Sequence, residues 1–456
     1  MNEIKLELHT NAVKNFNEKG IELISDLKEI IRKPIQEEIQ PFKPEVYIHQ
    51  KITEKDIIGD LEEIPMTLID QAGIHVGKYF IYKGKNIGLI YESYRKLLQL
   101  AQNIQKTKEL FNMVSVSVVT DLIFSWLVQK YRHKTFFPIV EYLLIKCKEE
   151  IKDFEVWIPV ALLHIQSDIK IGKITLQTIT KERLEYWRSK SKEIAPDYAK
   201  NIDELFDEER KQLQGFAAST IKLTAEPKRA FEIALEKTEN SISLLRFFSP
   251  ANFHPEMSSH CTVLGKENMQ STTHLLIDPD GSIRFNKSVV STARPHWIIN
   301  DQEISLFRKG GLDLLSNLLL LDQRTKFQEK ILESLYMYTK SSLLKDWSDK
   351  LIYILVALES ILLRNDSEPI QKNVSERMAF FIGRGLNERK SIIKSVTNTY
   401  GLRSKFLHHG YMIKDLFTFE EFMMHAWKFF SQLIQNANQF KTTEEFIEAI
   451  ENVKLA

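Results

Sequence analysis

Apolar residues between positions 306 and 456 recur every three or four positions, which is the spacing of amphipathic helices. This pattern predicts helices over residues 325–343 and 347–363 and a last long helix over about 419–437. The apolar seam of that last helix should be buried and consists of Phe422, Ala426, Phe429 and Leu433. A short terminal helix is expected after Thr442. This part of the chain should therefore be an antiparallel helical bundle.

Polar residues stand where several of these helices should begin. An N-cap side chain accepts a hydrogen bond from a backbone N–H of the first turn, and a Glu three residues later completes a capping box. The residues that match these positions are Asp346 alone, Asn373 with Glu376, Thr418 with Glu421, and Thr442 with Glu445. Each is expected to mark the start of a helix.

The preceding 305 residues mix two kinds of pattern. Helical spacing is found at 21–31, over a long stretch from 90 to about 150 and at about 227–248. Segments that are rich in β-branched residues, or that partly alternate, predict strands at 4–8, 154–158 and 169–179. Gly172 breaks the last of these segments. A mixed α/β region is therefore expected.

A hairpin is expected where residues 273–277 and 282–285 flank Asp278-Pro279-Asp280-Gly281. Proline fixes φ in such a turn, and glycine supplies its left-handed position. Regular structure is interrupted between 296 and 312, near Arg294-Pro295 and at Gly310-Gly311. We therefore expect an α+β protein, with a mixed region over 1–305 that subdivides near 150 and an all-α bundle over 306–456.

Composition narrows the class of protein without selecting one. The 456 residues are 27% charged and 43% apolar, which is typical of a globular protein with two or three domains. The 62 Lys and Arg residues nearly cancel the 61 Asp and Glu residues, so no overall field favours nucleic acid. The two cysteines, Cys147 and Cys261, fit a reducing cytoplasm and exclude a Cys-rich zinc module.

The same sequence argues against a membrane protein. The N-terminus carries no apolar signal core. The most apolar run, 114–128, contains Asp121 and is too short to span a bilayer comfortably, so it is interpreted as a buried helix. We therefore expect a cytoplasmic protein with no membrane segment.

Candidate chemistry lies in the segment 400–410, where Arg403 precedes His408 by five positions. RNA carries its own nucleophile, the 2′-hydroxyl, so its cleavage needs proton transfer and stabilisation of the phosphorane but no metal. Arginine presents paired donors to phosphate oxygens, and histidine exchanges a proton near neutral pH. Arg403 suits the first task and His408, or its neighbour His409, the second. The expected products are a 2′,3′-cyclic phosphate and a 5′-hydroxyl.

Helix geometry complicates this interpretation. Five positions turn a helix by about 140°, so Arg403 and His408 do not share a stripe. A two-fold dimer with the segments facing each other would place two arginines and two histidines in one cleft, so a composite site is expected. The spacing itself arises by chance in about one of two chains of this composition. Histidines before Gly410 also suit a helix C-terminus electrostatically.

Local charge favours a polyanion near this segment. Between Gln371 and Lys414 there are nine basic and two acidic residues, a net charge of +7 in a chain that is almost neutral overall. RNA contacts are expected from Arg384, Arg389, Lys390, Lys394 and Lys405. A solvated helix face is the alternative interpretation of such a run.

Taken together, residues from about 325 to 435 resemble the HEPN superfamily, and more closely its ApeA-like branch. Four segments carry the resemblance: Ala357-Leu358-Glu359-Ser360-Ile361-Leu362, the Arg377-containing helix at 375–382, Tyr400-Gly401-Leu402-Arg403-Ser404, and Lys405-Phe406-Leu407-His408. The last two complete an Arg-x4-His motif. The chain departs from the branch at His409, where the branch has Gly directly after its His.

The resemblance implies an α-helical bundle that dimerises through its motif helices. It also implies an endoribonuclease that needs neither a metal nor another cofactor and acts in defence against phage or as a toxin. By position, Arg403 and His408 take the catalytic places and Ser404 the polar place after the arginine. His409 is a possible auxiliary, and Glu359 matches an acidic helix position that could orient Arg403; a plain surface or core-edge ion pair is the alternative for Glu359. RNA, such as tRNA or mRNA, would be the substrate.

Two matters stay open at the level of sequence. By analogy, residues 1–305 are expected to sense a phage-derived or other trigger, or to restrain the nuclease. The alternative function is a non-catalytic RNA-binding and dimerisation module of the HEPN type. No metal site is expected, because the histidines and cysteine that are close in sequence lack metal-ligand spacing; these are His254, His260, Cys261, His274 and His296.

Overall fold

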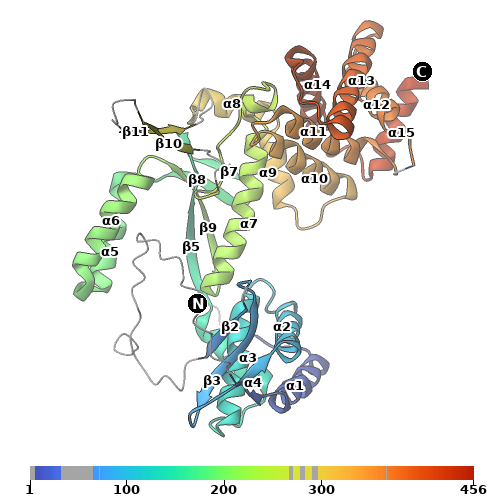
Figure 1. The fold of residues 1–456 in the computed structure, drawn as a ribbon. Helices are drawn as coiled ribbons and strands as arrows, with labels where there is room; N and C mark the ends of the chain where they lie inside the picture. The colour runs from blue at the N-terminus through green and yellow to red at the C-terminus, as the bar shows by residue number, and fades with distance from the viewer. Residues whose placement is uncertain are drawn as a thin grey trace. The chain divides into compact units, whose positions relative to one another are not determined.

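The protein is mixed α+β, with its sheets in the N-terminal region and a helical C-terminal region (Figure 1). A computed structural model describes residues 6–31, 65–70, 72–266, 271–277, 283–289, 296–365 and 367–455. The described chain forms two compact units, Met1–Phe154 with Lys222–Ile233, and Glu155–Ile221 with Ala234–Ala456. The first unit's first segment ends at Phe154, close to the subdivision expected near 150. Positions 305 and 306, where a boundary was expected, both lie in the second unit.

The first unit packs four helices with an antiparallel sheet. The strand order is β1-β4-β3-β2, and these strands are β1 (Lys28–Glu29), β2 (Met66–Ile69), β3 (His75–Tyr82) and β4 (Lys85–Ile90). The helices are α1 (Thr10–Ser25), α2 (Glu92–Gln105), α3 (Val116–Tyr131) and α4 (Ile139–Glu150). Phe80 of β3, Leu97 of α2 and Ile123 of α3 are fully buried in their common core.

Sequence predictions for this unit were right for the helices of 90–150, displaced for its first helix and incomplete for its sheet. Three helices occupy most of residues 90–150, as expected, and the apolar run at 114–128 lies largely in α3. The helix expected at 21–31 ends at Ser25 instead, and residues 6–8 form no strand; Ile4 and Lys5 lie outside the described residues. The β3–β4 hairpin was not predicted.

Glycines help to explain the missed hairpin. Gly77 and Gly88 lie within β3 and β4, where glycine lowers the strand signal of a sequence. A Cβ at Gly88 would collide with the carbonyl oxygen of Lys78 on the neighbouring strand. The close approach of the two backbones therefore requires the residue that weakens the pattern.

The second unit contains a four-stranded sheet in the order β5-β9-β8-β7. Its strands are β5 (Lys152–Pro159), β7 (Ile169–Ile171), β8 (Ile174–Thr178) and β9 (Ala217–Ala225). The strands expected at 154–158 and on either side of Gly172 are confirmed, and Gly172 makes the turn with φ +61°. The expected helix at 227–248 is α7 (Pro227–Arg246), on which Thr238 donates to Ser219 of β9 at 2.8 Å.

Three further features complete the sheet region. Helices α5 (Lys181–Ile194) and α6 (Ala199–Leu213) run side by side after β8, joined by a short 3-10 turn at Pro196–Tyr198 (Figure 1). Strand β6 (Leu163–Ile165) pairs in parallel with β12 (Trp297–Ile299). The predicted hairpin is confirmed as antiparallel strands β10 (Ser271–Ile277) and β11 (Ile283–Val289), while its turn at 278–281 lies outside the described residues.

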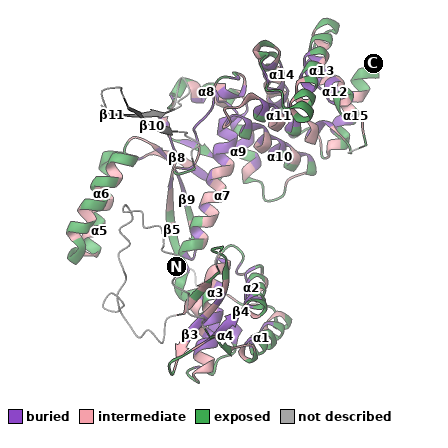
Figure 2. Ribbon diagram, in the orientation of Figure 1, coloured by how far each residue is buried: buried purple, intermediate pink, exposed green. Residues whose placement is uncertain are grey.

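Helices occupy the chain from residue 301 onward. They are α8 (Asp301–Lys309), α9 (Leu312–Leu320), α10 (Lys326–Ser341), α11 (Trp347–Leu362), α12 (Ile370–Ile382), α13 (Leu386–His409), α14 (Leu416–Gln435) and α15 (Thr443–Leu455). The four seam residues expected on the last long helix are fully buried, which confirms that prediction. Figure 2 shows the buried residues along the inner faces of α10 to α14 and few on α5 and α6.

The helix starts test the cap predictions one by one. Asp346 caps α11 by accepting from the backbone N–H groups of Ser348 and Asp349, and Thr442 accepts from the N–H of Glu445 at 3.2 Å. The cap predictions at Asn373 and Thr418 were wrong, since both residues lie inside helices that begin earlier. Pro369 precedes the first of these helices, and Asp415 caps the second.

Replacing the cap of α11 should destabilise the protein moderately. Asp346→Ala leaves two backbone donors of the first turn without their carboxylate acceptor. A cap substitution of this kind costs about 1 kcal/mol. Urea unfolding followed by circular dichroism should show this loss, whereas Asp349→Ala, which removes no cap acceptor, should cost less than half as much. Equal losses for both variants would contradict the cap assignment.

Buried polar contacts join the helices to the segment that precedes them. Lys350 of α11 is fully buried and donates to the carbonyl oxygens of Pro255, at 2.8 Å, and Met257. Burial lowers the pKa of Lys350 to about 8. Tyr338 of α10 donates to the carbonyl oxygen of Asn252 at 3.1 Å. These contacts tie α10 and α11 to the segment from Asn252 to Met257.

Candidate functional site

Helix α13 carries the segment with Arg403 and His408, and a glycine follows its last residue. Its C-cap, Gly410, has φ +67°, in the left-handed region that favours glycine. The N–H of Gly410 donates to the carbonyl oxygen of Phe406 at 2.9 Å, which satisfies one of the last carbonyls of the helix. The segment from Tyr400 to His409 is thus the last part of one 24-residue helix.

One face of α13 is buried against α11, α12 and α14. Ile392, Val396 and Tyr400 follow one another at intervals of four residues along this face. Arg403 lies three residues after Tyr400, so it continues the same face at the edge of the core. The packing of α13 therefore directs Arg403 toward α11.

The partner of both side chains is Glu359 of α11. The hydroxyl of Tyr400 donates to Oε1 of Glu359 at 2.9 Å, and Nη1 of Arg403 lies 4.0 Å from the same oxygen. The Glu359 side chain is 17% exposed and that of Arg403 is 32% exposed. Burial, followed by the neighbouring Glu359 carboxylate, raises the pKa of Tyr400, so its hydroxyl stays protonated as the donor.

This arrangement fixes the position of a guanidinium at the surface. The hydrogen bond from buried Tyr400 holds one oxygen of Glu359, and that oxygen faces Arg403. A partly exposed pair at 4.0 Å contributes little to stability. The guanidinium of Arg403 also has further N–H donors that can bond to an anion at the surface. Glu359, expected from sequence beside Arg403, does lie there.

The two histidines lie apart from this contact. His408 and His409 are both exposed in the last turn of α13, and the ring of His409 lies 6.0 Å from that of Tyr411. Along the helix, His408 is turned about 140° from Arg403. Ser404 is exposed as well. Within one chain, the candidate residues are thus on one helix but on different sides of it.

The five candidate RNA contacts are not equivalent. Arg384, Lys390, Lys394 and Lys405 are exposed. Arg389 is half-buried: its guanidinium lies 4.5 Å from the centroid of the Phe380 ring, and its Nε donates to the carbonyl oxygen of Gly383 at 3.2 Å. Arg389 therefore already has partners within the helical region, and the four exposed residues are the more accessible contacts for a polyanion.

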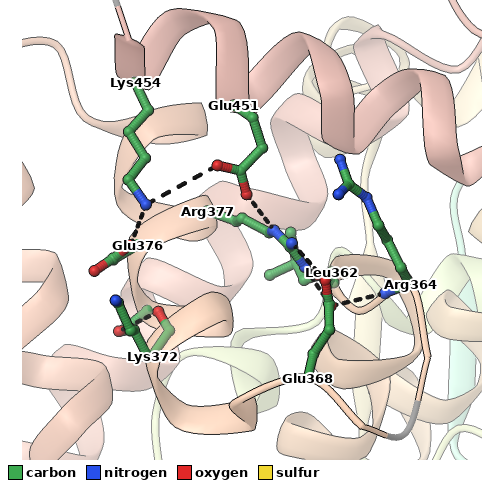
Figure 3. A network of polar contacts seen from close by, with 9 residues as sticks. Leu362, Arg364, Glu368, Lys372, Glu376, Arg377, Glu451 and Lys454 are labelled. Atoms are coloured by element: carbon green, nitrogen blue, oxygen red, sulfur yellow. Dashed lines mark hydrogen bonds and ion pairs between the residues drawn. The ribbon is translucent and has the colours of Figure 1, made fainter.

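Arg377, counted in the basic run, has a structural role instead. It is 4% exposed, and its guanidinium contacts Glu368 at 2.7 Å and Glu451 at 2.9 Å while donating to the carbonyl oxygen of Leu362 at 2.6 Å (Figure 3). The hydrogen bond from Arg377 is the main cause that lowers the pKa of Glu368 to about 2. Arg377 thus joins α11, α12 and α15, and it does not add to an accessible basic surface.

The hydrogen bond from Tyr400 to Glu359 was not predicted from the sequence. In the sequence, Tyr400 is only part of the segment Tyr400-Gly401-Leu402-Arg403-Ser404. The signal was present, because Ile392, Val396 and Tyr400 share one helical stripe and a tyrosine at the end of a buried stripe needs an acceptor for its hydroxyl. That the acceptor is Glu359, 41 residues earlier, depends on tertiary packing.

The histidines near the sheet make other contacts. His296 Nδ1 lies 3.0 Å from Nε2 of His164, and His254 Nδ1 lies 3.3 Å from Oε1 of Glu420. The side chain of His274 lies outside the described residues. Among the described side chains, no three from His, Cys, Asp and Glu gather closely enough to hold a metal ion.

Two observations on the whole chain complete the description. None of the helices in the described ranges is both long and apolar enough to cross a membrane. Comparison of the sequence and structure with protein-family models, with curated proteins and with solved structures finds no match.

Proposed function

We propose that this protein is a metal-independent endoribonuclease of the HEPN type, with Arg403 and His408 as its catalytic residues. The observation that carries the proposal is the contact among Glu359, Tyr400 and Arg403. It holds a permanently charged guanidinium at the surface on the helix that also presents an exposed His408. A cation in a fixed position is what a phosphorane with developing negative charge requires.

The proposed reaction uses only the groups of RNA and of the protein. The 2′-oxygen forms a bond to phosphorus while its proton passes to a histidine, and the bond from phosphorus to the 5′-oxygen breaks. A histidine delivers a proton to the leaving 5′-oxygen. Arg403 donates to the non-bridging oxygens as their charge grows. The products are a 2′,3′-cyclic phosphate and a 5′-hydroxyl.

A dimer would unite groups that one chain keeps apart. The end of α13 and the segment after it present exposed apolar side chains, which in a single chain remain in contact with water; they are Leu407, Tyr411, Met412 and Phe417. A second copy of the chain placed against this surface would bury them and bring the two motif segments together. We propose that Arg403 of one copy and His408 of the other serve the same phosphate.

The biological setting follows from the resemblance to HEPN proteins and is part of the proposal. A nuclease of this kind would act in defence against phage or as a toxin, on tRNA or mRNA. Residues 1–305 would bind a phage-derived or other trigger. The four exposed basic residues along α13 and just before it, at 384, 390, 394 and 405, would contact the RNA backbone.

Removal of the guanidinium tests the proposal. Arg403→Ala should lower the rate of RNA cleavage by about 10²–10³, since it removes a donor that acts on the developing charge. The assay is purified protein on total RNA with EDTA present, followed by analysis of the product ends. A cyclic phosphate from wild type and none from the variant is expected.

The control and the contrary results are well defined. Lys340→Ala alters an exposed cation on α10 and should leave cleavage unchanged. Equal activity of Arg403→Ala and wild type would overturn the catalytic role. RNA binding that depends on the residues at 384, 390 and 394, without any cleavage by wild type, would instead establish the non-catalytic RNA-binding module.

A further inference from the structure

A hollow of about 480 Å³ lies beside Glu359 in the helical region. Its walls come from α10, α11, the α11–α12 connection, α12 and the start of α15. The apolar part of its lining consists of Val356, Leu363 and Ile370. The polar part includes Ser360, Asn365 and Thr443. The hollow thus combines an aliphatic wall with side chains that can donate or accept hydrogen bonds.

Two cations line the hollow, Arg364 and Lys330. The backbone N–H of Arg364 donates to Glu368 at 3.0 Å, but no described residue receives a hydrogen bond or an ion pair from its guanidinium. Figure 3 shows this guanidinium turned away from Glu368 and Arg377. The second cation, Lys330, lies 3.3 Å from Glu333 of its own helix. The guanidinium of Arg364 therefore keeps hydrogen-bond donors that an anion can use, although its charge also acts on Glu368 and Glu444.

The lining also carries two carboxylates, Glu359 and Glu444, and the charge of Arg364 is among the causes that lower the pKa of Glu444. Glu359 is occupied by Tyr400 and Arg403, so its charge is already paired. Glu444 lies in the first turn of α15, where the partial positive charge of the helix N-terminus offsets a negative side chain. The same helix end favours an approaching phosphate over a cation.

Glu359 links the hollow to the proposed cleavage site. It lines the hollow and at the same time contacts Arg403, the residue proposed to meet the scissile phosphate. A nucleotide next to that phosphate would therefore reach the hollow without leaving the surface of α11. We infer that the hollow is a subsite for a nucleotide of the RNA strand that flanks the scissile phosphate, an inference that rests on the proposed function.

The parts of a nucleotide match the parts of the lining. The base would pack against the aliphatic wall, where burial of apolar surface is tolerant of base identity. Asn365, Ser360 and Thr443 would hydrogen-bond to base edges or to the 2′-hydroxyl, which supplies specificity. The guanidinium of Arg364 and the ammonium of Lys330 would pair with the phosphate of that nucleotide. This subsite would select the position at which RNA is cut.

The test measures binding apart from cleavage. A fluorescent oligonucleotide that is 2′-O-methylated throughout cannot supply the attacking hydroxyl, so its affinity for the full chain reports binding without cleavage, and the comparison with the hollow variants isolates the share of the subsite. Arg364→Ala should weaken this affinity about tenfold through the loss of a charge-assisted bond. Val356→Trp, which fills the hollow from another element, should weaken it similarly. Arg308→Ala, an exposed arginine on α8, is the matched control and should bind as wild type does.

Cleavage of four oligoribonucleotides that differ in one base beside the cut adds a second readout. Arg364→Ala should raise KM and reduce the differences among the four substrates, with little change in kcat. Unchanged affinity and unchanged preference in both hollow variants would overturn the subsite, even if Arg403→Ala confirms the nuclease. Oligonucleotide binding that depends on Arg364 without any cleavage by wild type would count against the nuclease and would overturn the assignment of the hollow to a nucleotide beside the cut. No oligonucleotide binding by wild type would overturn the subsite.

Discussion

His408→Ala should lower the rate of RNA cleavage by about 10²–10⁴, the range expected for loss of a general acid or base. His408 is exposed in the last turn of α13, so its replacement removes a proton carrier without opening the core. RNA binding should change little, because the basic residues of α13 are untouched. The measurement is single-turnover cleavage with excess protein, which separates the chemical step from binding.

His409→Ala is the matched comparison. The two histidines are neighbours, both exposed, and both stand next to the negative end of the same helix. A purely structural role at the helix end would make the two substitutions equivalent. We expect His409→Ala to retain cleavage within about threefold, since His408 takes the motif position. Loss of activity in His409→Ala with retention in His408→Ala would reverse the assignment, and retention in both would remove histidine from the mechanism.

The sequence predicted the helical region better than the sheets, for a physical reason. A helix repeats its apolar positions over many turns, so α10, α11 and α14 were located from their own residues. The strands of the first unit are short or contain glycine. The two residues of β1 are too few to show an alternating apolar pattern. Strand β1 also pairs with β4, about 60 residues later, and a local pattern does not record such a pairing.

Part of the candidate site was predictable for a similar reason. Arg403 and His408 were found by local spacing, whereas the acceptor of Tyr400 lies on another helix. The basic run shows the opposite error: Arg377 was counted as surface charge, because its partners Glu368 and Glu451 are nine and 74 residues away. A charge count along the chain cannot distinguish a solvated arginine from one buried between two carboxylates.

The buried arginine gives the largest stability effect that we expect. Arg377→Met keeps the length of the side chain but removes the partner of Glu368 and Glu451 and one donor to the carbonyl oxygen of Leu362. Because an unpaired carboxylate remains in a largely buried place, the free energy of unfolding should fall by about 3 kcal/mol. Arg308→Met, which removes an exposed pair at 3.9 Å, should cost less than about 0.5 kcal/mol.

The pH dependence of this effect has a definite sign. The folded protein lowers the pKa of Glu368 from 4.5 to about 2, so this carboxylate stabilises the fold above about pH 4.5, and the stabilisation is lost as the pH falls toward 2. The difference in the free energy of unfolding between wild type and Arg377→Met should therefore become smaller toward acid. With allowance for solvent screening, it should decrease by about 1 kcal/mol from pH 6 to pH 3.5. Urea unfolding at the two pH values measures it. A gap that stays constant or widens toward acid would show that Glu368 does not carry the interaction.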